Sequence, residues 1–559
     1  MPFPHSAHGE QAGKRKRLEW IFLITAGVFL YILAVYVWWA TIKANGGHLD
    51  WLEILHNGLE TLVGKEFVLI DHPPIPPSQA LSIAGFGAKL LLGLALIKGA
   101  LAAFHSRIEN FKFGKVKGHT ILCGAGERGD ALARRLLERG EKVALVEIDS
   151  DNSHLGELRS LGAHVVVGNA MDIATLQDAG LSRARSLVAV TTKDQSNLAI
   201  CREATTHAGC PARAGVESFE MRSYFKDNIP VAKLGASIAL VSFQCRAARQ
   251  LLLELATEMV KDKAIRDKGV HLLVEADDVF REEILRAAAL MLQISGDVRP
   301  RFDVTRVGTD DKDRFETRFP ESRIVVDIRW HETHAEAVLP EHGEHHPDVA
   351  IFALESDVLT LEAAERFRIR HKTPGSRIVA CLRSTSELYS LALATRNNQK
   401  EGIVIKNLFG LGFGSDDPLD YALDKEAAQL HLDYCRIAKS SDPKWNKYPE
   451  EWEKLDELTR DSNRLQAAHH IVKRAAWASK DTDHDEDLLI HLARSEHMRW
   501  MAEKAMDGWR GPGAENPERR EDKLRIHNRL VPYDALSLIE KDKDLNPILK
   551  ALGLPERKS

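Results

Sequence analysis

Apolar residues in the middle of this chain occur in short runs that are separated by longer amphipathic segments. The first two runs are residues 120–123 and 143–146, and the amphipathic segment between them ends at Gly140. Short apolar runs predict buried strands, and the amphipathic segment predicts a helix. Strands that alternate with helices along the chain are typical of a parallel sheet with helices on both faces, so we expect an α/β, Rossmann-like fold.

A glycine-rich turn joins the first predicted strand to the first predicted helix. Gly124, Gly126 and Gly129 have the spacing GxGxxG. In this motif the first glycine allows a sharp turn, the second lets the backbone approach a pyrophosphate, and the third lets helix and strand pack closely. Glu147 lies about 20 residues further on, where a carboxylate accepts hydrogen bonds from a ribose. The turn predicts a dinucleotide or adenosine site; the alternative is a Rossmann-type domain whose turn holds no ligand.

The pattern continues through a third and a fourth strand and indicates a family. Residues 165–167 lead into Gly168-Asn169-Ala170, and residues 186–190 lead into a Thr-Thr-Lys-Asp-Gln-Ser-Asn segment. Residues 118–218 resemble the TrkA-N, or RCK, domain that gates potassium channels and transporters, although an asparagine replaces the acid of the family's GDA turn. The resemblance implies an adenine nucleotide, either NAD(H), ATP or ADP, or a cyclic signalling nucleotide. The predicted binding residues are Gly124, Gly126, Arg128, Gly129, Glu147, Asp149, Asn169, Ala170, Thr191 and Asp194.

A second set of strands and helices follows the first and suggests a tandem repeat. We interpret residues 118–230 and 269–414 as like domains, joined within residues 231–265 by an apolar helix over residues 232–259. Where the repeat needs its glycine turn it has Glu-Ala-Asp-Asp, and these carboxylates would repel a phosphate. We therefore predict a structural or interface copy. The predicted strands are residues 270–274, 301–307, 323–328, 348–354 and 376–381, with helices over 277–293, 359–370 and 387–396.

Histidines are concentrated in one segment of this second domain. Clusters of histidine can bind a metal. The glutamate, proline and glycine residues around them favour a solvated loop instead, and we predict no metal site. The histidines are His331, His334, His342, His345 and His346.

The N-terminal part of the chain predicts a membrane hairpin. Residues 20–40 and 80–104 are apolar stretches, each long enough to cross a hydrocarbon core of about 30 Å. Basic residues flank the outer ends of the pair, so the positive-inside rule places both termini in the cytoplasm. We predict a basic N-terminus over residues 1–17, a hairpin over residues 18–105, and an inner (plasma) membrane location.

The segment between the two spans has a helical stripe of apolar residues over 49–62, in the position of a pore helix. The residues that follow it do not match the TVGYG filter of potassium channels. Lys89, within the second span, is expected to face a cavity or a partner helix; the alternative is a simple anchor hairpin. The architecture favours a channel but gives no support for potassium selectivity.

Beyond residue 414 the pattern is helical and rich in aromatic residues. The motifs Arg-Asp-Ser-Asn-Arg, Glu-His-Met-Arg-Trp, Gly-Trp and Val-Pro-Tyr occur in order over residues 425–535. They resemble the RyR repeat domain of ryanodine receptors and its bacterial relatives, so we predict such an all-α domain over residues 420–559. Arginine and tryptophan can hold phosphate and stack a base; the alternative is a bundle with an internal Arg–Glu pair and core tryptophans. The predicted ligand pocket is Trp452, Arg460, Asn463, His497, Arg499, Trp500, Trp509 and Tyr533.

Composition narrows the function further. A net charge of −5 and a pI near 6.6 argue against nucleic-acid binding, which usually needs a basic surface. The six cysteines form no CxxC pair, so we expect reduced, buried thiols. No nucleophile–base pair, HExxH or Walker lysine occurs, so we predict no enzyme activity.

Together these features predict a nucleotide-regulated, channel-like membrane protein that forms a homo-oligomer, on the analogy of RCK channels a tetramer. One alternative is a defence or stress effector that permeabilises the membrane when it binds a signalling nucleotide. Another is a Rossmann oxidoreductase on a membrane anchor.

Overall fold

The structure is a computed structural model of the whole chain. It describes residues 28–40, 42–44, 51–63, 93, 113, 116–228, 238–338, 346–371, 376–383, 402–413, 423–441, 448–455, 457–480, 485–513 and 515–557. By its contacts the chain divides into two units, and each is described by itself. One unit is residues 1–118 with 151–165, and the other is residues 119–150 with 166–559.

The described N-terminal residues form a small helical pair. Residues 28–40 are helical, and α2 (Trp51–Val63) confirms the helical stripe predicted over 49–62. Trp38 and Ile54 are buried together between the two helices, whereas Leu52 is 78% exposed. Among the residues that the structure describes, no helix is both long and apolar enough to cross a membrane. Residues 20–27 of the first predicted span, and all of the second except Gly93, lie outside the described ranges.

The first sheet has six strands in the order β3-β2-β1-β4-β5-β6. The chain reverses its direction of strand addition between β1 and β4, whose parallel register pairs Ile121 with Leu187. Helices α4 (Glu127–Glu138), α5 (Leu155–Ser160), α6 (Ile173–Asp178), α7 (Asp194–Ala208) and α8 (Phe219–Asn228) connect or follow the strands. The strands are β1 (Thr120–Cys123), β2 (Val143–Glu147), β3 (His164–Val167), β4 (Ser186–Ala189), β5 (Ala212–Gly215) and β6 (Ile238–Val241).

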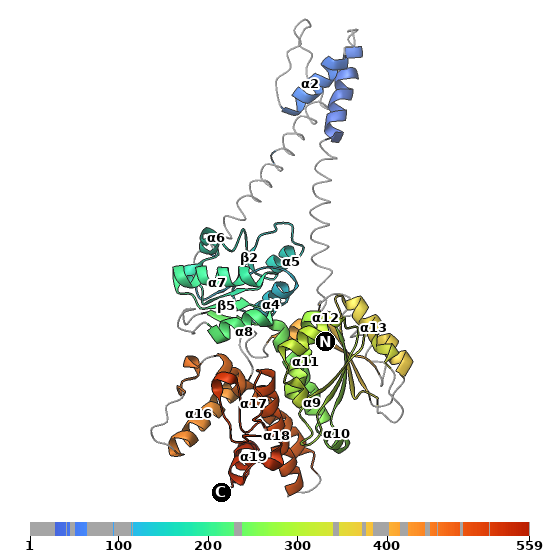
Figure 1. The fold of residues 1–559 in the computed structure, drawn as a ribbon. Coiled ribbons are helices and arrows are strands. Elements are labelled where there is room, and N and C mark those ends of the chain that lie inside the picture. The colour runs from blue at the N-terminus through green and yellow to red at the C-terminus, as the bar shows by residue number, and fades with distance from the viewer. Residues whose placement is uncertain are drawn as a thin grey trace. The chain divides into compact units, whose positions relative to one another are not determined.

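The second sheet repeats this topology, with the order β12-β11-β10-β7-β8-β9. Its reversal lies between β7 and β10, which are the counterparts of β1 and β4. The prediction of two tandem Rossmann-like domains is therefore confirmed (Figure 1). Strands β7 (His271–Ala276), β8 (Arg301–Val304), β9 (Asp327–Trp330), β10 (Val349–Ala353), β11 (Arg377–Leu382) and β12 (Val404–Asn407) alternate with α11 (Asp278–Met291), α12 (Thr309–Arg318), α13 (Asp357–His371) and α15 (Leu408–Gly412).

Two elements predicted from the sequence were wrong in their boundaries. The helix predicted over 232–259 starts only at α9 (Phe243–Met259), because residues 238–241 pair with β5 as strand β6. The Ser242 side chain caps α9 by accepting a hydrogen bond from the N–H of Cys245, 3.0 Å away. The strand predicted over 323–328 is split into the short helix η3 (Ser322–Ile324) and β9. Helix α12 and strand β12 were not predicted, and the helix predicted over 387–396 lies outside the described residues.

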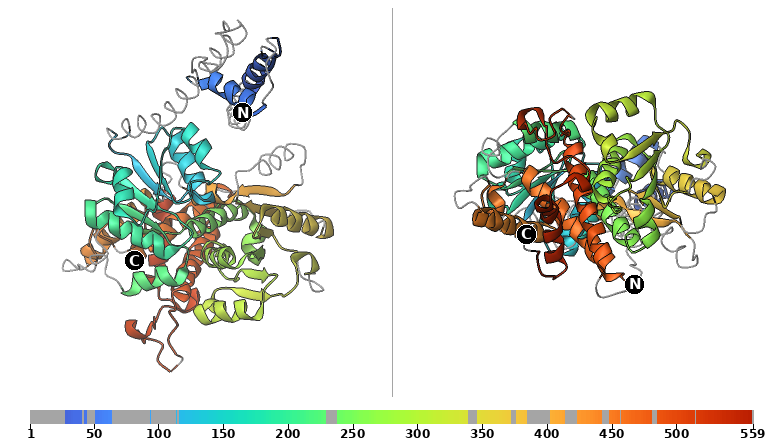
Figure 2. Two further views of the ribbon diagram at one scale, coloured as in Figure 1. Left: turned by 90° about the horizontal axis from the view of Figure 1, so that it is seen from above. Right: turned by 60° about the horizontal axis from the view of Figure 1, so that its bottom comes forward.

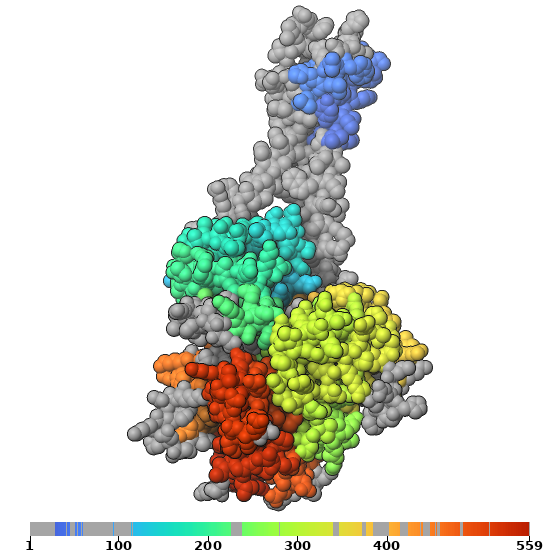
Figure 3. Space-filling view, viewed as in Figure 1, coloured from blue at the N-terminus to red at the C-terminus, as the bar shows by residue number. Residues whose placement is uncertain are grey.

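The C-terminal helices pack on the second Rossmann-like domain and share its hydrophobic core. The helices are α16 (Asp424–Ser441), α17 (Glu457–Ala478), α18 (Glu486–Met506) and α19 (Leu538–Ala551), drawn from orange to red in Figure 1. Both rotated views keep this bundle beside the green and yellow second domain (Figure 2), and the space-filling view shows their surfaces in contact (Figure 3).

Polar contacts close this junction. The Ser495 hydroxyl donates to the carbonyl of Gln293 at 2.5 Å, and Arg494 pairs with Asp297 at 2.7 Å. A Cβ on Gly296 would lie 2.5 Å from the Cβ of Arg494, so the close approach of α18 requires glycine there.

Candidate nucleotide site

The turn after β1 needs two of its three glycines for steric reasons. Gly124 has φ of 102°, and a Cβ there would lie 3.1 Å from the backbone nitrogen of Thr191. A Cβ on Gly129 would lie 1.9 Å from the carbonyl oxygen of Gly124. Gly126 differs, because a Cβ there would meet nothing within 4 Å. The turn is therefore tightly packed on its inner side and open at Gly126, which is the side from which a phosphate would approach.

The helix that follows the turn begins without a side-chain cap. Gly126 is the N-cap of α4, and as a glycine it has no side chain that could cap the helix. The N–H groups of the first turn of a helix have no partner within the helix, and the helix dipole adds partial positive charge there. A twelve-residue helix that starts this way offers donors to an anionic group such as a pyrophosphate.

Glu147, at the end of β2, holds the turn in place. The residue is 9% exposed. Oε2 accepts a hydrogen bond from the N–H of Ala125 at 2.6 Å, and Oε1 accepts from Ile148 at 2.8 Å and Asp149 at 3.1 Å. An ionised carboxylate has about four lone-pair sites, so acceptor capacity remains for a ribose hydroxyl. The structure therefore brings together Glu147, Asp149 and the glycine turn, and their predicted contacts with a ligand stay predictions.

Arg128 connects the turn to the helix between the two Rossmann-like domains. Its Nη1 donates to Oε1 of Glu217 at 2.8 Å. Glu217 also accepts from the Ser242 hydroxyl at 2.6 Å and from the N–H groups of Phe243 and Gln244 at 3.2 and 3.3 Å. Glu217 thus caps α9 while it binds an arginine from the predicted ligand site. Glu217 was not among the predicted residues, although its place just after β5 puts it at the same edge of the sheet.

The remaining predicted residues lie after β3 and β4, at the carboxyl edge of the same sheet. The hydroxyl of Thr191 donates to Oδ1 of the fully buried Asn197 at 2.7 Å. Asp194 accepts from the N–H of Ser218 at 2.8 Å, and Asn169 accepts from Met171 at 3.0 Å while Ala170 is 9% exposed. In this structure these polar side chains hold loops in place, and their predicted contacts with a ligand stay predictions.

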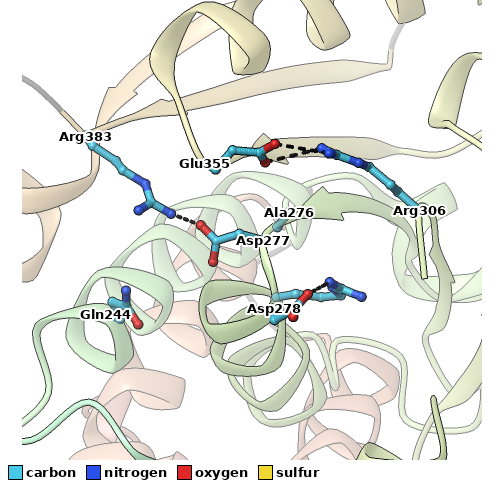
Figure 4. A pocket seen from close by; sticks show the side chains of 8 residues that line it. Gln244, Ala276, Asp277, Asp278, Arg306, Glu355 and Arg383 are labelled. Carbon is cyan, nitrogen blue, oxygen red and sulfur yellow. Dashed lines mark hydrogen bonds and ion pairs between the residues drawn. The ribbon is translucent and has the colours of Figure 1, made fainter. Parts of the chain in front are cut away.

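At the equivalent edge of the second domain lies a cavity of about 470 Å³ (Figure 4). Asp277 pairs with Arg383, and Asp278 pairs with Arg281. The carboxylate of Glu355 accepts hydrogen bonds from Nη2 and Nη1 of Arg306, at 3.1 and 3.3 Å. Asp277, Asp278 and Glu355 each have an arginine partner, so the repulsion argued from the sequence for Asp277 and Asp278 left out these arginines. The lining residues are Gln244, Ala276, Asp277, Asp278, Arg281, Arg306, Glu355 and Arg383.

Part of the pocket predicted in the C-terminal bundle forms a cluster of aromatic rings. The centroid of the Trp500 ring lies 5.0 Å from that of His527 and 5.7 Å from that of His497. Trp509 contacts His527 at 6.0 Å, and Tyr533 contacts His497 at 5.9 Å. His527 was not among the predicted residues, and burial lowers its pKa to about 4. The structure thus brings four predicted residues, His497, Trp500, Trp509 and Tyr533, together with His527.

The other predicted bundle residues make structural contacts elsewhere. Arg499 is 4% exposed and pairs with Glu496 at 2.9 Å and Glu503 at 2.8 Å, inside the bundle. Burial alone would raise the pKa of Glu496, but Arg499 and Lys473 hold it well below its ordinary value. For Arg499, the structure thus shows the internal Arg–Glu pair given above as the alternative.

Trp452, Arg460 and Asn463 lie before or near the start of α17. The guanidinium of Arg464 lies over the Trp452 ring at 5.6 Å, and Asn463 donates to the carbonyl of Thr459 at 2.7 Å. Arg460 is partly exposed. The predicted use of these residues in a ligand pocket stays a prediction.

Comparison with known proteins places the first Rossmann-like domain in a family. Residues 120–229 match the TrkA-N domain, which confirms this part of the predicted resemblance. The chain is 26% identical over 193 residues to the "Glutathione-regulated potassium-efflux system protein KefC" of Cronobacter sakazakii, covering 32% of this chain and 30% of that protein. It is 34% identical over 107 residues to the "Trk system potassium uptake protein TrkA" of Streptomyces coelicolor, covering 19% and 44%.

Further matches are a third curated relative and several solved structures. An uncharacterized protein of Methanothermus fervidus is 27% identical over 191 residues, covering 33% of this chain and 29% of that protein. Each of these matches spans less than half the length of the relative. Among solved structures, GsuK bound to ADP is 17% identical, with 71% of this chain and 96% of that chain covered and a TM-score of 0.37.

Proposed function

We propose that this chain is a nucleotide-regulated component of membrane ion transport, whose first Rossmann-like domain binds an adenine nucleotide at residues 124–129. The observation that carries the proposal is the turn itself, which is tight at Gly124 and Gly129 and open at Gly126. The TrkA-N match supports it, as do relatives that are named for potassium efflux and potassium uptake. The proposal assigns no catalytic residue.

The residues around the turn have separate tasks in this proposal. The N–H groups at the start of α4 bind the phosphates, and Glu147 accepts hydrogen bonds from the ribose. Asn169, at the end of the neighbouring strand β3, offers an amide at the same edge of the sheet. NAD(H), ATP, ADP and a cyclic signalling nucleotide all carry the adenosine and phosphate groups that these residues would bind.

Arg128 connects the proposed nucleotide site to helix α9 through Glu217. A guanidinium binds phosphate in the same forked geometry in which it binds a carboxylate. A phosphate at the turn would therefore compete with Glu217 for Arg128, and Glu217 also caps α9. A ligand shifts a conformational equilibrium only by its difference in affinity for the two states. In this proposal, the Arg128–Glu217 pair is the contact that differs between those states.

The wider proposal places this regulation on a membrane pore. It includes the two predicted spans with cytoplasmic termini, a homotetramer, and a RyR-like C-terminal domain that senses a second nucleotide. The test is ion flux through the full-length chain reconstituted in liposomes, measured with and without NAD, ADP and ATP. We expect at least one nucleotide to change the flux of a small cation, and we expect Gly126→Asp to abolish that response.

The same vesicles separate the proposal from its alternative. Release of a large encapsulated dye when a nucleotide is added would favour the membrane-permeabilising effector. Unchanged flux while the nucleotide is bound would contradict the transport function and leave the binding site standing.

A further inference from the structure

A buried carboxylate at the end of β7 lies beside a histidine and a second carboxylate. Glu275 is the fifth residue of β7, His334 is the N-cap of the short helix η4 (Ala335–Ala337), and Glu336 lies within η4. One donor atom of each side chain lies within 4.8 Å of the donor atoms of the other two. Two backbone segments that are about 60 positions apart thus bring three metal-ligating groups together in the second Rossmann-like domain.

Among the residues that the structure describes, Glu275 has no permanently charged cation beside it. Its side chain is fully buried. Oε1 contacts Nδ1 of His334 at 3.1 Å, and Oε2 accepts from the N–H of Ala335 at 2.6 Å and from the Thr305 hydroxyl at 3.2 Å. Within the described part of the chain, no lysine or arginine pairs with this carboxylate. A buried charge is costly unless it is paired or binds a metal, so the surroundings of Glu275 favour a cation.

Glu336 supplies an independent sign of a missing partner. Its Oε1 accepts from Nε of Arg366 at 3.0 Å. Its Oε2 is shielded from solvent and has no hydrogen-bond partner among the described residues. Buried polar atoms in folded proteins almost always have a partner, and an unsatisfied one calls for an explanation such as an ion.

We propose that Glu275, His334 and Glu336 bind a divalent transition-metal ion of the Zn²⁺ class. One imidazole and two carboxylates suit zinc better than Ca²⁺ or Mg²⁺, which prefer ligand sets made only of oxygen. The inference is independent of the proposed nucleotide site, because the metal site belongs to the other Rossmann-like domain.

The ligands need a small movement to close around the ion. Zinc bonds of about 2.0–2.2 Å in tetrahedral geometry separate neighbouring ligand atoms by roughly 3.4 Å, so the 4.8 Å cluster is wider than the closed site. His334 can supply the movement, since its side chain is 52% exposed. The hydrogen bonds from Ala335, Thr305 and Arg366 would remain and orient the two carboxylates, as outer partners do in metal sites.

The proposed site also distinguishes the histidine that would bind the metal from its neighbours in the same segment. His331 lies three positions away, yet its Nε2 bonds to Asp303 at 2.8 Å and not to the cluster. Sequence crowding alone gives no way to separate these two histidines. Because His331 shares the segment but contacts a different carboxylate, it provides a matched control.

The test is a calorimetric titration of ZnCl₂ into the full-length chain after treatment with EDTA. We expect one Zn²⁺ per chain to bind, at least 100-fold weaker binding in His334→Ala and Glu336→Gln, and unchanged binding in His331→Ala. Thermal unfolding of each variant without metal checks that it folds. We choose Glu336→Gln as the carboxylate variant because a substitution of the fully buried Glu275 could prevent folding.

Three outcomes would overturn the proposal: no binding of Zn²⁺, binding that survives both His334→Ala and Glu336→Gln, or equal loss in the His331→Ala control. X-ray absorption of the zinc-loaded chain provides a separate readout. Nitrogen and oxygen ligands are expected, and a first shell of sulfur would assign the ion to cysteines instead.

Discussion

An aspartate at Gly126 provides a sharp test of the nucleotide site, because this position tolerates a side chain but faces the proposed phosphates. Gly126 has φ of −65° and ψ of −178°, a conformation that any residue adopts. A Cβ at this position would meet no atom within 4 Å. We therefore expect Gly126→Asp to fold normally, so that any loss of binding reports on charge and not on packing.

Coulomb's law gives the size of the effect. Two unit negative charges about 4 Å apart repel by about 4 kcal/mol at an effective dielectric constant of about 20. Since each 1.4 kcal/mol changes an equilibrium constant about tenfold, the variant should bind a nucleotide diphosphate roughly 10³-fold more weakly. Part of this loss should disappear at high salt, because ions screen exposed charges.

The assay is calorimetric titration of ADP and NAD into the full-length protein, with Gly126→Asn as the matched control. Asparagine has nearly the size of aspartate but no charge, so we expect a loss of less than tenfold. Undiminished binding in Gly126→Asp would refute the placement of the phosphates at this turn. Equal losses in the two variants would show that bulk, and not charge, is responsible.

Three further predictions address packing, acid stability and the bundle. Gly129→Ala should lower the free energy of unfolding by about 1–3 kcal/mol or more, since its methyl group would overlap the carbonyl of Gly124; a melting temperature equal to that of the wild type would contradict the geometry. Burial lowers the pKa of His470 to about 4, so the folded state resists the proton that the unfolded state binds near pH 6.5. Protonation of His470 alone should therefore lower stability by about 2 kcal/mol between pH 7 and pH 5, and urea denaturation of His470→Asn should show a fall that is smaller by about this amount than in the wild type. Trp500→Ala should weaken any nucleotide bound at the aromatic cluster by about 1–3 kcal/mol; in a folded variant, unchanged thermal shifts would count against stacking on this ring.

The fold was predictable where a local sequence pattern determines the structure. The strands around Ile121 and Leu187 are fully buried apolar runs, and the glycine spacing marks the turn between strand and helix. Strand β6 was missed because its Ile-Ala-Leu-Val run merges with the apolar pattern of α9, and a short apolar run does not distinguish strand from helix. The Ser242 cap that separates them becomes informative only once the strand is known.

The location of the candidate site was predictable from the sequence, but the hydrogen bonds and ion pairs between its residues were not. The motif identifies Glu147, but a contact between its carboxylate and the N–H of Ala125 depends on how the turn folds. Arg128 and Glu217 are 89 positions apart, so one sequence gives no sign that they pair. The same limit applies to Arg383, which neutralises Asp277 from across the second sheet.

The most direct test of the central claim is a cryo-EM reconstruction of the full-length chain saturated with ADP or NAD. The account predicts density for phosphates at Gly126 and the start of α4, with the ribose against Glu147. Nucleotide density found only at the cluster of Trp500 and Trp509, with the glycine turn empty, would contradict it.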